Sequence, residues 1–257
     1  MKLTVRRPAL AATESAPGPV AAPTSAAAAT DRAFLRIGAV AGITGILVQV
    51  LMEGLHPSRA APNDSAAAFL EYAASTRWTY VHIGQFLGTL LVVLCLLALA
   101  RPLSRQPGYP GGLATVGAVT AALAATVFAV QMAVDGVALR QAVDTWVAAA
   151  PGPAKTSAFQ VAEGVRALEK GLSGFFHLAN GLTLVALGLS LALGLAYPRW
   201  LGWTAVASGS AFLVGGVITA RTGFSPEAGR WLTPALVLLV VFLVGASVPM
   251  WRGRGTA

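Results

Sequence analysis

Charged residues, cysteine and histidine are all scarce in this sequence. Only 11% of its 257 residues are charged and 56% are hydrophobic, whereas roughly 25% of the residues of an ordinary soluble domain are charged. Cys95 is the only cysteine, which excludes a disulfide framework within the chain and a zinc site built from several cysteines. Together with a mean hydropathy of +0.69, these shortages indicate a membrane protein.

The sequence also lacks the motifs of several enzyme classes. It contains no H-E-x-x-H, no G-x-S-x-G, no phosphate-binding loop and no paired Asp-rich diphosphate motif. The formal net charge is +8, but the basic residues are dispersed at the ends of apolar runs. This dispersion argues against a nucleic-acid partner and favours a role of the basic residues in membrane topology.

Six apolar runs are long enough to cross a bilayer as helices, which takes about 20 residues each. We therefore predict an all-α integral membrane protein with a six-transmembrane-helix bundle over residues 31–257. Residues 1–30 are rich in Ala, Pro, Thr and Ser without apolar periodicity, so we expect a disordered cytoplasmic tail there. The predicted spans cover residues 34–55, 78–100, 112–134, 172–197, 200–220 and 231–251.

The basic residues predict that both termini are cytoplasmic. With the N-terminus inside, ten Lys and Arg residues and two acidic residues fall on the cytoplasmic side, against eight basic and eight acidic residues outside. Tryptophans at the ends of the runs fit an interfacial aromatic belt. These belt candidates are Trp78, Trp200, Trp203, Trp231 and Trp251.

The long connection over residues 135–171 has the composition of two helices. The segment VALRQAVDTWVAAA keeps its apolar residues close to helical spacing, and the turn Pro151-Gly152-Pro153 follows it. We predict that this connection is an extracytoplasmic helical hairpin that extends spans three and four.

Polar residues form four stripes at the predicted extracytoplasmic ends of the first four spans. Side chains three or four positions apart share one face of a helix. Since a charged residue at the bilayer centre costs about 2.5 to 3.5 kcal/mol, we expect the stripes to face one another in a pocket under the hairpin. The predicted pocket consists of Gln49, Glu53, His56, His82, Gln85, Gln131, Asp135, His177 and Asn180. We accordingly expect leucine to be more damaging at Glu53 or Asp135 than at the loop residue Glu71.

Three chemical hypotheses fit this pocket. A divalent metal is one, because histidine and carboxylate ligands suit zinc, iron or manganese, and its ligands would be Glu53, His56, His82 and His177. The second is a b-type haem between His82 and His177, which would make the protein an oxidoreductase. The third is acid–base chemistry on a lipid or another small molecule, with Glu53 or Asp135 as a buried acid.

A non-catalytic function is the alternative to all three. Buried polar groups also hold transmembrane helices together, and histidines respond to mildly acidic pH, so the protein could equally serve in sensing or assembly. No motif identifies a ligand, an oligomeric state or a partner besides the lipid bilayer. The sequence leaves open whether the protein is an enzyme.

Three strings, WTYVHIGQFLGTLL, AVDGVALRQAVDTWVAAAP and VAEGVRALEKG, resemble sequences of uncharacterised multi-span membrane proteins of high-GC bacteria. The similarity extends over residues 79–224. It implies a bacterial plasma-membrane protein and attaches no activity to it. Asp135, Gly136, Glu163, Arg166 and Glu169 lie within these strings, but the resemblance gives them no role.

Overall fold

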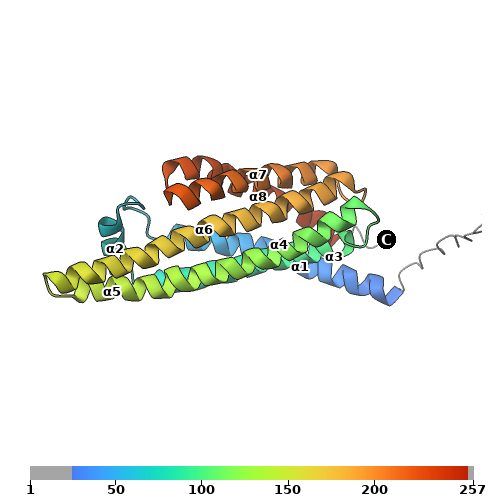
Figure 1. Ribbon diagram of the computed structural model, residues 1–257. Coiled ribbons are helices and arrows are strands. Elements are labelled where there is room, and N and C mark those ends of the chain that lie inside the picture. The colour runs from blue at the N-terminus through green and yellow to red at the C-terminus, as the bar shows by residue number, and fades with distance from the viewer. Residues whose placement is uncertain (1–24, 254–257) are drawn as a thin grey trace, which may run out of the picture.

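The computed structural model describes residues 25–253, and this range is helical throughout apart from short connections (Figure 1). Most of the predicted tail over residues 1–30 lies outside the described residues, whereas Ser25 and the five residues after it belong to the first helix. The elements are α1 (Ser25–Leu55), α2 (Ser65–Ala74), α3 (Trp78–Leu103), α4 (Tyr109–Ala133), the π-helical segment η1 (Val134–Leu139), α5 (Arg140–Ala148), α6 (Pro153–Leu193), α7 (Arg199–Thr222) and α8 (Pro226–Trp251).

Within residues 25–253, six helices are long and apolar enough to cross a membrane, and the third of them runs continuously through α4, η1 and α5. This confirms the prediction of an all-α chain with six candidate spans and indicates a multi-pass membrane protein. The main differences from the predicted boundaries are in the third and fourth spans, which belong to helices of 40 and 41 residues. The candidate spans lie within Ala28–Leu55, Trp78–Leu103, Tyr109–Ala148, Pro153–Leu193, Arg199–Thr222 and Pro226–Trp251.

The six long helices form a closed ring in chain order. Each packs against its neighbours in the sequence, from α1 to α3, α4, α6, α7 and α8, and α8 returns to α1. Leucine and alanine side chains dominate the main core of the ring, which is expected where neighbouring helices bury a shared apolar face. This core includes Leu35, Leu99, Leu187, Phe212 and Phe242.

Glycines repeated every seven residues bring α6 and α7 into close contact. The repeat places three glycines on one face of each helix, and antiparallel packing pairs them across the interface. A Cβ atom on Gly181 would lie 2.8 Å from the carbonyl oxygen of Gly209, so a larger residue does not fit there. Small residues that allow close backbone approach are typical of helix pairs in membranes. The glycines are Gly174, Gly181 and Gly188 on α6 and Gly202, Gly209 and Gly216 on α7.

The helices on either side of the turn at residues 149–152 are about twice as long as a bilayer requires. At 1.5 Å per residue, 40 residues extend for about 60 Å, against a hydrocarbon thickness of about 30 Å. In Figure 1, α5 and the beginning of α6 project past the ends of α7 and α8, together with α2. A second apolar cluster holds this projecting part together and includes Phe69, Trp78, Leu139 and Val143.

The glycine contacts predict opposite effects of alanine at two positions of α6. Gly181→Ala should lower the free energy of unfolding by about 1 to 3 kcal/mol, because the added methyl group meets the backbone of α7. Gly164→Ala should raise it by up to about 1 kcal/mol, because this glycine faces open space and alanine favours a helix. Chemical unfolding of the two purified variants in detergent measures both effects. Equal stability of the two would contradict the packing of α6 on α7.

Candidate functional site

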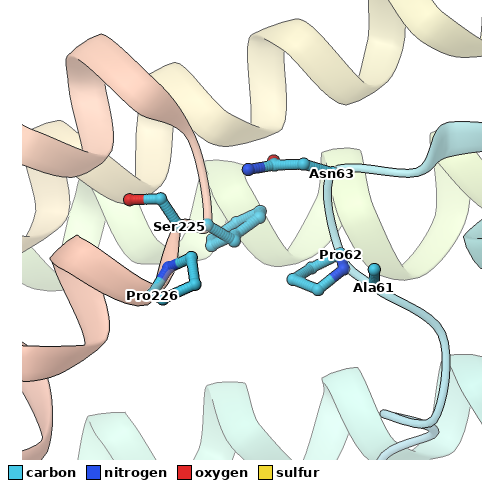
Figure 2. A pocket seen from close by; sticks show the side chains of 6 residues that line it. Ala61, Pro62, Asn63, Ser225 and Pro226 are labelled. Atoms are coloured by element: carbon cyan, nitrogen blue, oxygen red, sulfur yellow. The ribbon is translucent and has the colours of Figure 1, made fainter.

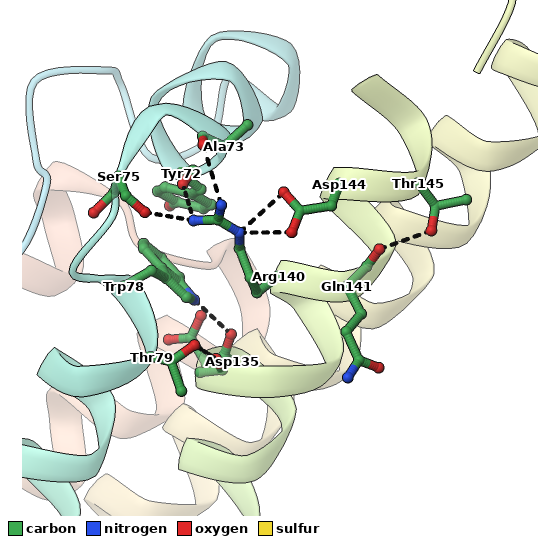
Figure 3. Close-up of polar contacts among 11 residues, drawn as sticks. Tyr72, Ala73, Ser75, Trp78, Thr79, Asp135, Arg140, Gln141, Asp144 and Thr145 are labelled. Atoms are coloured by element: carbon green, nitrogen blue, oxygen red, sulfur yellow. Dashed lines mark hydrogen bonds and ion pairs between the residues drawn. The ribbon is translucent and has the colours of Figure 1, made fainter. Parts of the chain in front are cut away.

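The helix that contains Asp135 widens into a π-helical turn at the level of the candidate site. In the segment η1, the wider turn directs two backbone carbonyl groups towards α3. Trp78 Nε1 donates a hydrogen bond of 2.9 Å to the carbonyl oxygen of Asp135, and Thr79 Oγ1 donates one of 3.0 Å to that of Gly136 (Figure 3). Such π-turns are frequent at functional sites. The first turn of α3 therefore stabilises the bulge.

Gly136 allows α3 to approach this bulge closely. A Cβ atom at position 136 would lie 2.5 Å from the Cβ of His82, so only glycine fits. The close approach brings the side chain of Asp135 to His82, and the distance between Asp135 Oδ2 and His82 Nε2 is 3.0 Å. Both residues are buried, with exposed fractions of 6% and 1%.

His82 lies between two groups that normally accept hydrogen bonds. Its Nδ1 is 2.7 Å from the carbonyl oxygen of Trp78, and its Nε2 contacts the carboxylate of Asp135. A carbonyl oxygen can only accept, so Nδ1 carries a hydrogen. Since a neutral imidazole has only one N–H, the contact between His82 and Asp135 requires one further proton, either on the imidazole or on the carboxyl group.

The α6 helix adds an ion pair to this site. Arg166 Nη1 donates a hydrogen bond of 2.6 Å to Glu169 Oε2, and both side chains are nearly fully buried. Arg166 Nη2 also donates to the carbonyl oxygen of Pro62, and its guanidinium lies over the ring of Phe224 at 4.9 Å. Arginine suits such a position because its planar guanidinium can donate to several acceptors and stack on an aromatic ring at once.

The register between α4 and α6 places Asp135 next to Glu169. Thr183 Oγ1 and Thr120 Oγ1 are 3.0 Å apart, and two helical turns closer to the site the rings of Phe128 and Phe176 are 4.5 Å apart. Continuation of this register into η1 brings the two carboxyl groups close enough for their charges to interact. The site is thus a chain of four buried polar groups in the order Arg166, Glu169, Asp135, His82, which we call the buried polar chain.

Aromatic rings cover the His82 end of the buried polar chain. The ring of Trp78 lies 4.4 Å from that of His82 and 4.0 Å from that of Tyr72, between centroids. His56 lies against both Trp78 and His82, at 5.2 and 5.3 Å. Burial lowers the pKa of His56, and burial raises the pKa of Tyr72 to about 12. Both groups therefore favour their neutral forms in the folded protein.

Arg140 anchors the short helix α2 above these rings. Its guanidinium donates to three carbonyl oxygens at the C-terminal end of α2, those of Tyr72, Ala73 and Ser75 (Figure 3). Its Nε atom also pairs with Asp144 one turn further along α5. A cation at the C-terminus of a helix satisfies carbonyl groups that have no partner within the helix. Arg140 thereby fixes Tyr72 over Trp78.

A small apolar cleft borders the Arg166 end of the buried polar chain. It has a volume of about 360 Å³ and opens between the connection before α2 and the turn before α8 (Figure 2). Pro62 and Phe224, which both contact Arg166, form part of its wall. The other lining residues are Ala61, Asn63, Ser225 and Pro226.

Only some of the predicted pocket residues meet in the structure. His56, His82 and Asp135 gather as described, but Glu53 is exposed and does not join them. The amide of Gln49 instead donates to the backbone of Gln85 and to a threonine, Thr89, which links α1 to α3 deeper in the bundle.

The remaining three predicted residues lie further along α4 and α6. Gln131 and Asn180 are buried. The His177 ring stacks on Phe212 at 5.8 Å, and its buried Nδ1 atom has no hydrogen-bond partner. Instead of the predicted single pocket, the structure has the buried polar chain at the end of the bundle and separate polar residues nearer the middle of the bundle.

The structure does not bring the proposed metal ligands together. Among residues 25–253, no group of three or more His, Cys, Asp or Glu side chains is arranged to hold a metal ion. Glu53 is exposed, and His177 lies between α6 and α7 rather than beside His56. The haem hypothesis requires a free nitrogen on His82, but both of its ring nitrogens are engaged.

Four residues of the site lie outside the predicted set of pocket residues, namely Tyr72, Trp78, Arg166 and Glu169. Trp78 was assigned to the interfacial belt but is only 2% exposed, because α2 and α5 cover it. The other four belt candidates are all exposed, as an interfacial position requires. The signal that could have identified the α6 pair is the i, i+3 spacing of Arg166 and Glu169, which lets opposite charges meet on one helix face.

Comparisons with protein-family models, with curated proteins and with solved structures find no match to this chain. The resemblance to membrane proteins of high-GC bacteria therefore stays a prediction. The function has to be argued from the geometry of the site.

The carboxylates of Glu71 and Glu53 should differ in their importance for stability, in the opposite order to that expected from the sequence. Glu71 accepts the backbone N–H groups of Arg59 and Ala60 at 2.9 and 2.8 Å, which lowers its pKa and fixes the connection before α2. Glu71→Ala should cost about 1 kcal/mol of unfolding free energy. Glu53→Ala should change it by less than about 0.5 kcal/mol, and thermal unfolding of both variants tests this order.

His56 should make the protein less stable in acid. Because its pKa is lowered on folding, the unfolded chain, with a histidine pKa of roughly 6.5, binds this proton more readily, and stability falls as the pH falls below that value. His56→Gln removes this contribution. Between about pH 7.5 and about pH 5, the variant should lose less thermal stability than the unsubstituted protein. An equal loss in both proteins would show that His56 does not titrate in this way.

Proposed function

We propose that this chain is a bacterial plasma-membrane protein whose buried polar chain binds one proton from the extracytoplasmic side, and that the protein senses external pH. The observation that carries this proposal is the position of His82 between the Trp78 carbonyl and the Asp135 carboxylate. This arrangement is complete only when one extra proton is present.

The charges of the buried polar chain support the same conclusion. Arg166 and Glu169 compensate each other, which leaves the charge of Asp135 unbalanced if His82 is neutral. An unbalanced charge in a low-dielectric interior is costly. Uptake of one proton by His82 or Asp135 makes the four groups neutral together, so the protonation state and the packing of this region are coupled.

The proposed orientation follows from the opposite end of the bundle. There Asp31 pairs with Arg101 and Arg105, and further arginines, including Arg199 and Arg252, are exposed. An excess of arginine favours the cytoplasmic side. The buried polar chain then faces the extracytoplasmic side, with α5 and the start of α6 as the proposed outer hairpin and both termini in the cytoplasm.

The covering elements offer a way for a proton to alter the outer surface. Trp78 touches His82 through its ring and Asp135 through its N–H group, and it stacks on Tyr72 of α2. A new charge on His82 would therefore act directly on the packing of α2. Histidine is suited to this role because its ordinary pKa lies within the physiological range.

The second candidate function is acid–base chemistry on a small molecule or lipid. The specific observation in its favour is the cleft of about 360 Å³, because two of its wall residues, Pro62 and Phe224, contact Arg166. In that case Asp135 or Glu169 would serve as the acid, and Arg166 would orient the ligand. Glu53, as an exposed residue, has no place in this alternative.

The proton-binding proposal predicts the effect of replacing Asp135 by its amide. In Asp135→Asn, the side-chain N–H group can donate to His82 Nε2, so the contact no longer needs an extra proton. Infrared difference spectra between neutral and acidic pH should show protonation of a buried carboxyl or imidazole group in the unsubstituted protein. This signal should be lost in Asp135→Asn.

Asp144→Asn provides the matched control, since Asp144 is about half exposed and pairs with Arg140 outside the buried polar chain. The control should keep the difference signal. An unchanged signal in Asp135→Asn would mean that the proton resides elsewhere and would refute the proposal.

A further inference from the structure

Two buried oxygen atoms on one face of the α4–η1 helix have no hydrogen-bond partner. These are Gln131 Oε1 and Asp135 Oδ1, in side chains of residues that are 7% and 6% exposed. Four positions apart, they lie one helical turn from each other. Buried acceptors without a partner are rare because each costs about 1 to 3 kcal/mol. Such a pair indicates that something with positive charge or hydrogen-bond donors fits between them.

A second pair of oxygen-bearing side chains faces the first pair from α6. The register that places Glu169 beside Asp135 also places Ser173, one turn further along α6, beside Gln131. Glu169 and Ser173 are likewise buried, at 2% and 3% exposure. By this register, four oxygen-bearing groups lie on the facing sides of α4–η1 and α6, two of them carboxyl groups and two of them neutral.

The charge of this position favours a monovalent cation. When no proton is bound, Arg166, Glu169, Asp135 and neutral His82 carry one net negative charge. A single positive charge balances it, whereas a divalent ion would leave an excess. Carboxylate, amide and hydroxyl oxygens are ligands for hard cations. Sites for sodium ions or protons in membrane proteins are typically built where a helix departs from regular geometry, as α4 does at η1.

We propose that Gln131, Asp135, Glu169 and Ser173 form a binding site for a monovalent alkali cation between α4 and α6. The cation competes with the proton of the buried polar chain, because either one supplies the missing positive charge. This inference rests on the proposed function in one respect, since Asp135 belongs to both sites. It adds a ligand class and two residues, Gln131 and Ser173, that proton binding does not need.

The other charged and titratable groups around this site bear on the competition. They come from each element that packs on the buried polar chain, and they stay the same in all the variants below. They are His56 in the connection before α2, Tyr72 on α2, His82 on α3, Arg140 on α5, and Arg166 and Lys170 on α6.

Thermal unfolding of the purified full-length protein in detergent tests the proposal, with sodium chloride titrated against choline chloride at constant ionic strength. A ligand that binds only the folded state raises the unfolding midpoint as its concentration exceeds its dissociation constant. We expect sodium to raise the midpoint and choline to have no effect. In the pH range where the proton competes, the sodium concentration for half the effect should rise about tenfold for each unit decrease in pH.

Substitutions then assign the effect to the site. Gln131→Leu should abolish the sodium-dependent shift, and Ser173→Ala should raise the half-effect concentration at least about tenfold, the equivalent of one lost ligand. Gln141→Leu is the matched control, because Gln141 is an exposed glutamine on α5, outside the proposed site. If Gln131→Leu fails to fold, Ser173→Ala still provides the test, since it removes only one small hydroxyl group.

The outcomes separate this inference from the proposed function. If sodium and choline have the same effect at every pH, the cation site is refuted, while a pH-dependent infrared signal that requires Asp135 would still support proton binding. If the sodium shift persists in both Gln131→Leu and Ser173→Ala, the ion binds elsewhere and the assignment is refuted. If neither sodium nor the Asp135 substitution changes the protein, both proposals fail.

Discussion

The contact between His82 and Asp135 depends on several features of the surrounding structure. It joins two ionisable side chains inside an apolar bundle. The His82 imidazole lies between two acceptors, the Trp78 carbonyl and the Asp135 carboxylate, so both contacts can be hydrogen bonds only if one extra proton is bound. For the contact to form, the helix must widen at η1 and residue 136 must be glycine, since any Cβ there would collide with His82. Trp78 and Thr79 then satisfy the carbonyl groups that the wider turn redirects. Both of these carbonyl groups are therefore hydrogen-bonded by the first turn of α3.

The architecture outside the site supplies rigidity and low polarity. The glycine pairs between α6 and α7 allow direct backbone contact, which fixes α6 and with it the ion pair of Arg166 and Glu169. The second apolar cluster includes Phe69, Leu139 and Trp78, and it covers the His82 end of the site. Because electrostatic interactions are stronger where water is excluded, these apolar contacts increase the cost of an unbalanced charge in the buried polar chain. Packing far from the site therefore contributes to its chemistry.

The sequence allowed the fold to be predicted better than the site. Six apolar runs correctly gave six candidate spans, because hydropathy over about 20 residues needs no knowledge of helix packing. The site depends on two things that periodicity cannot reveal. A π-turn changes the direction of its carbonyl groups, so the contacts of the Asp135 and Gly136 carbonyl oxygens with α3 could not be predicted from regular helical spacing. The register between α4 and α6 decides that Glu169, and not His177, faces Asp135. Glu53 was predicted to line the pocket, but the last turn of α1, which carries it, is exposed.

The uneven distribution of polar groups bears on whether anything crosses the bundle. Beyond the level of Gln131, the core between the helices consists mainly of leucine and alanine. The hydroxyl groups there are already used: Thr183 donates to its own helix, and Ser190 donates to the carbonyl oxygen of Pro110. A conducted ion would have to shed its ligands in this region without replacement, at a cost of several kcal/mol. A site that is rich in ligands at one end and sealed by apolar packing below it is suited to reversible binding from one side, which is what a sensor requires and a channel does not.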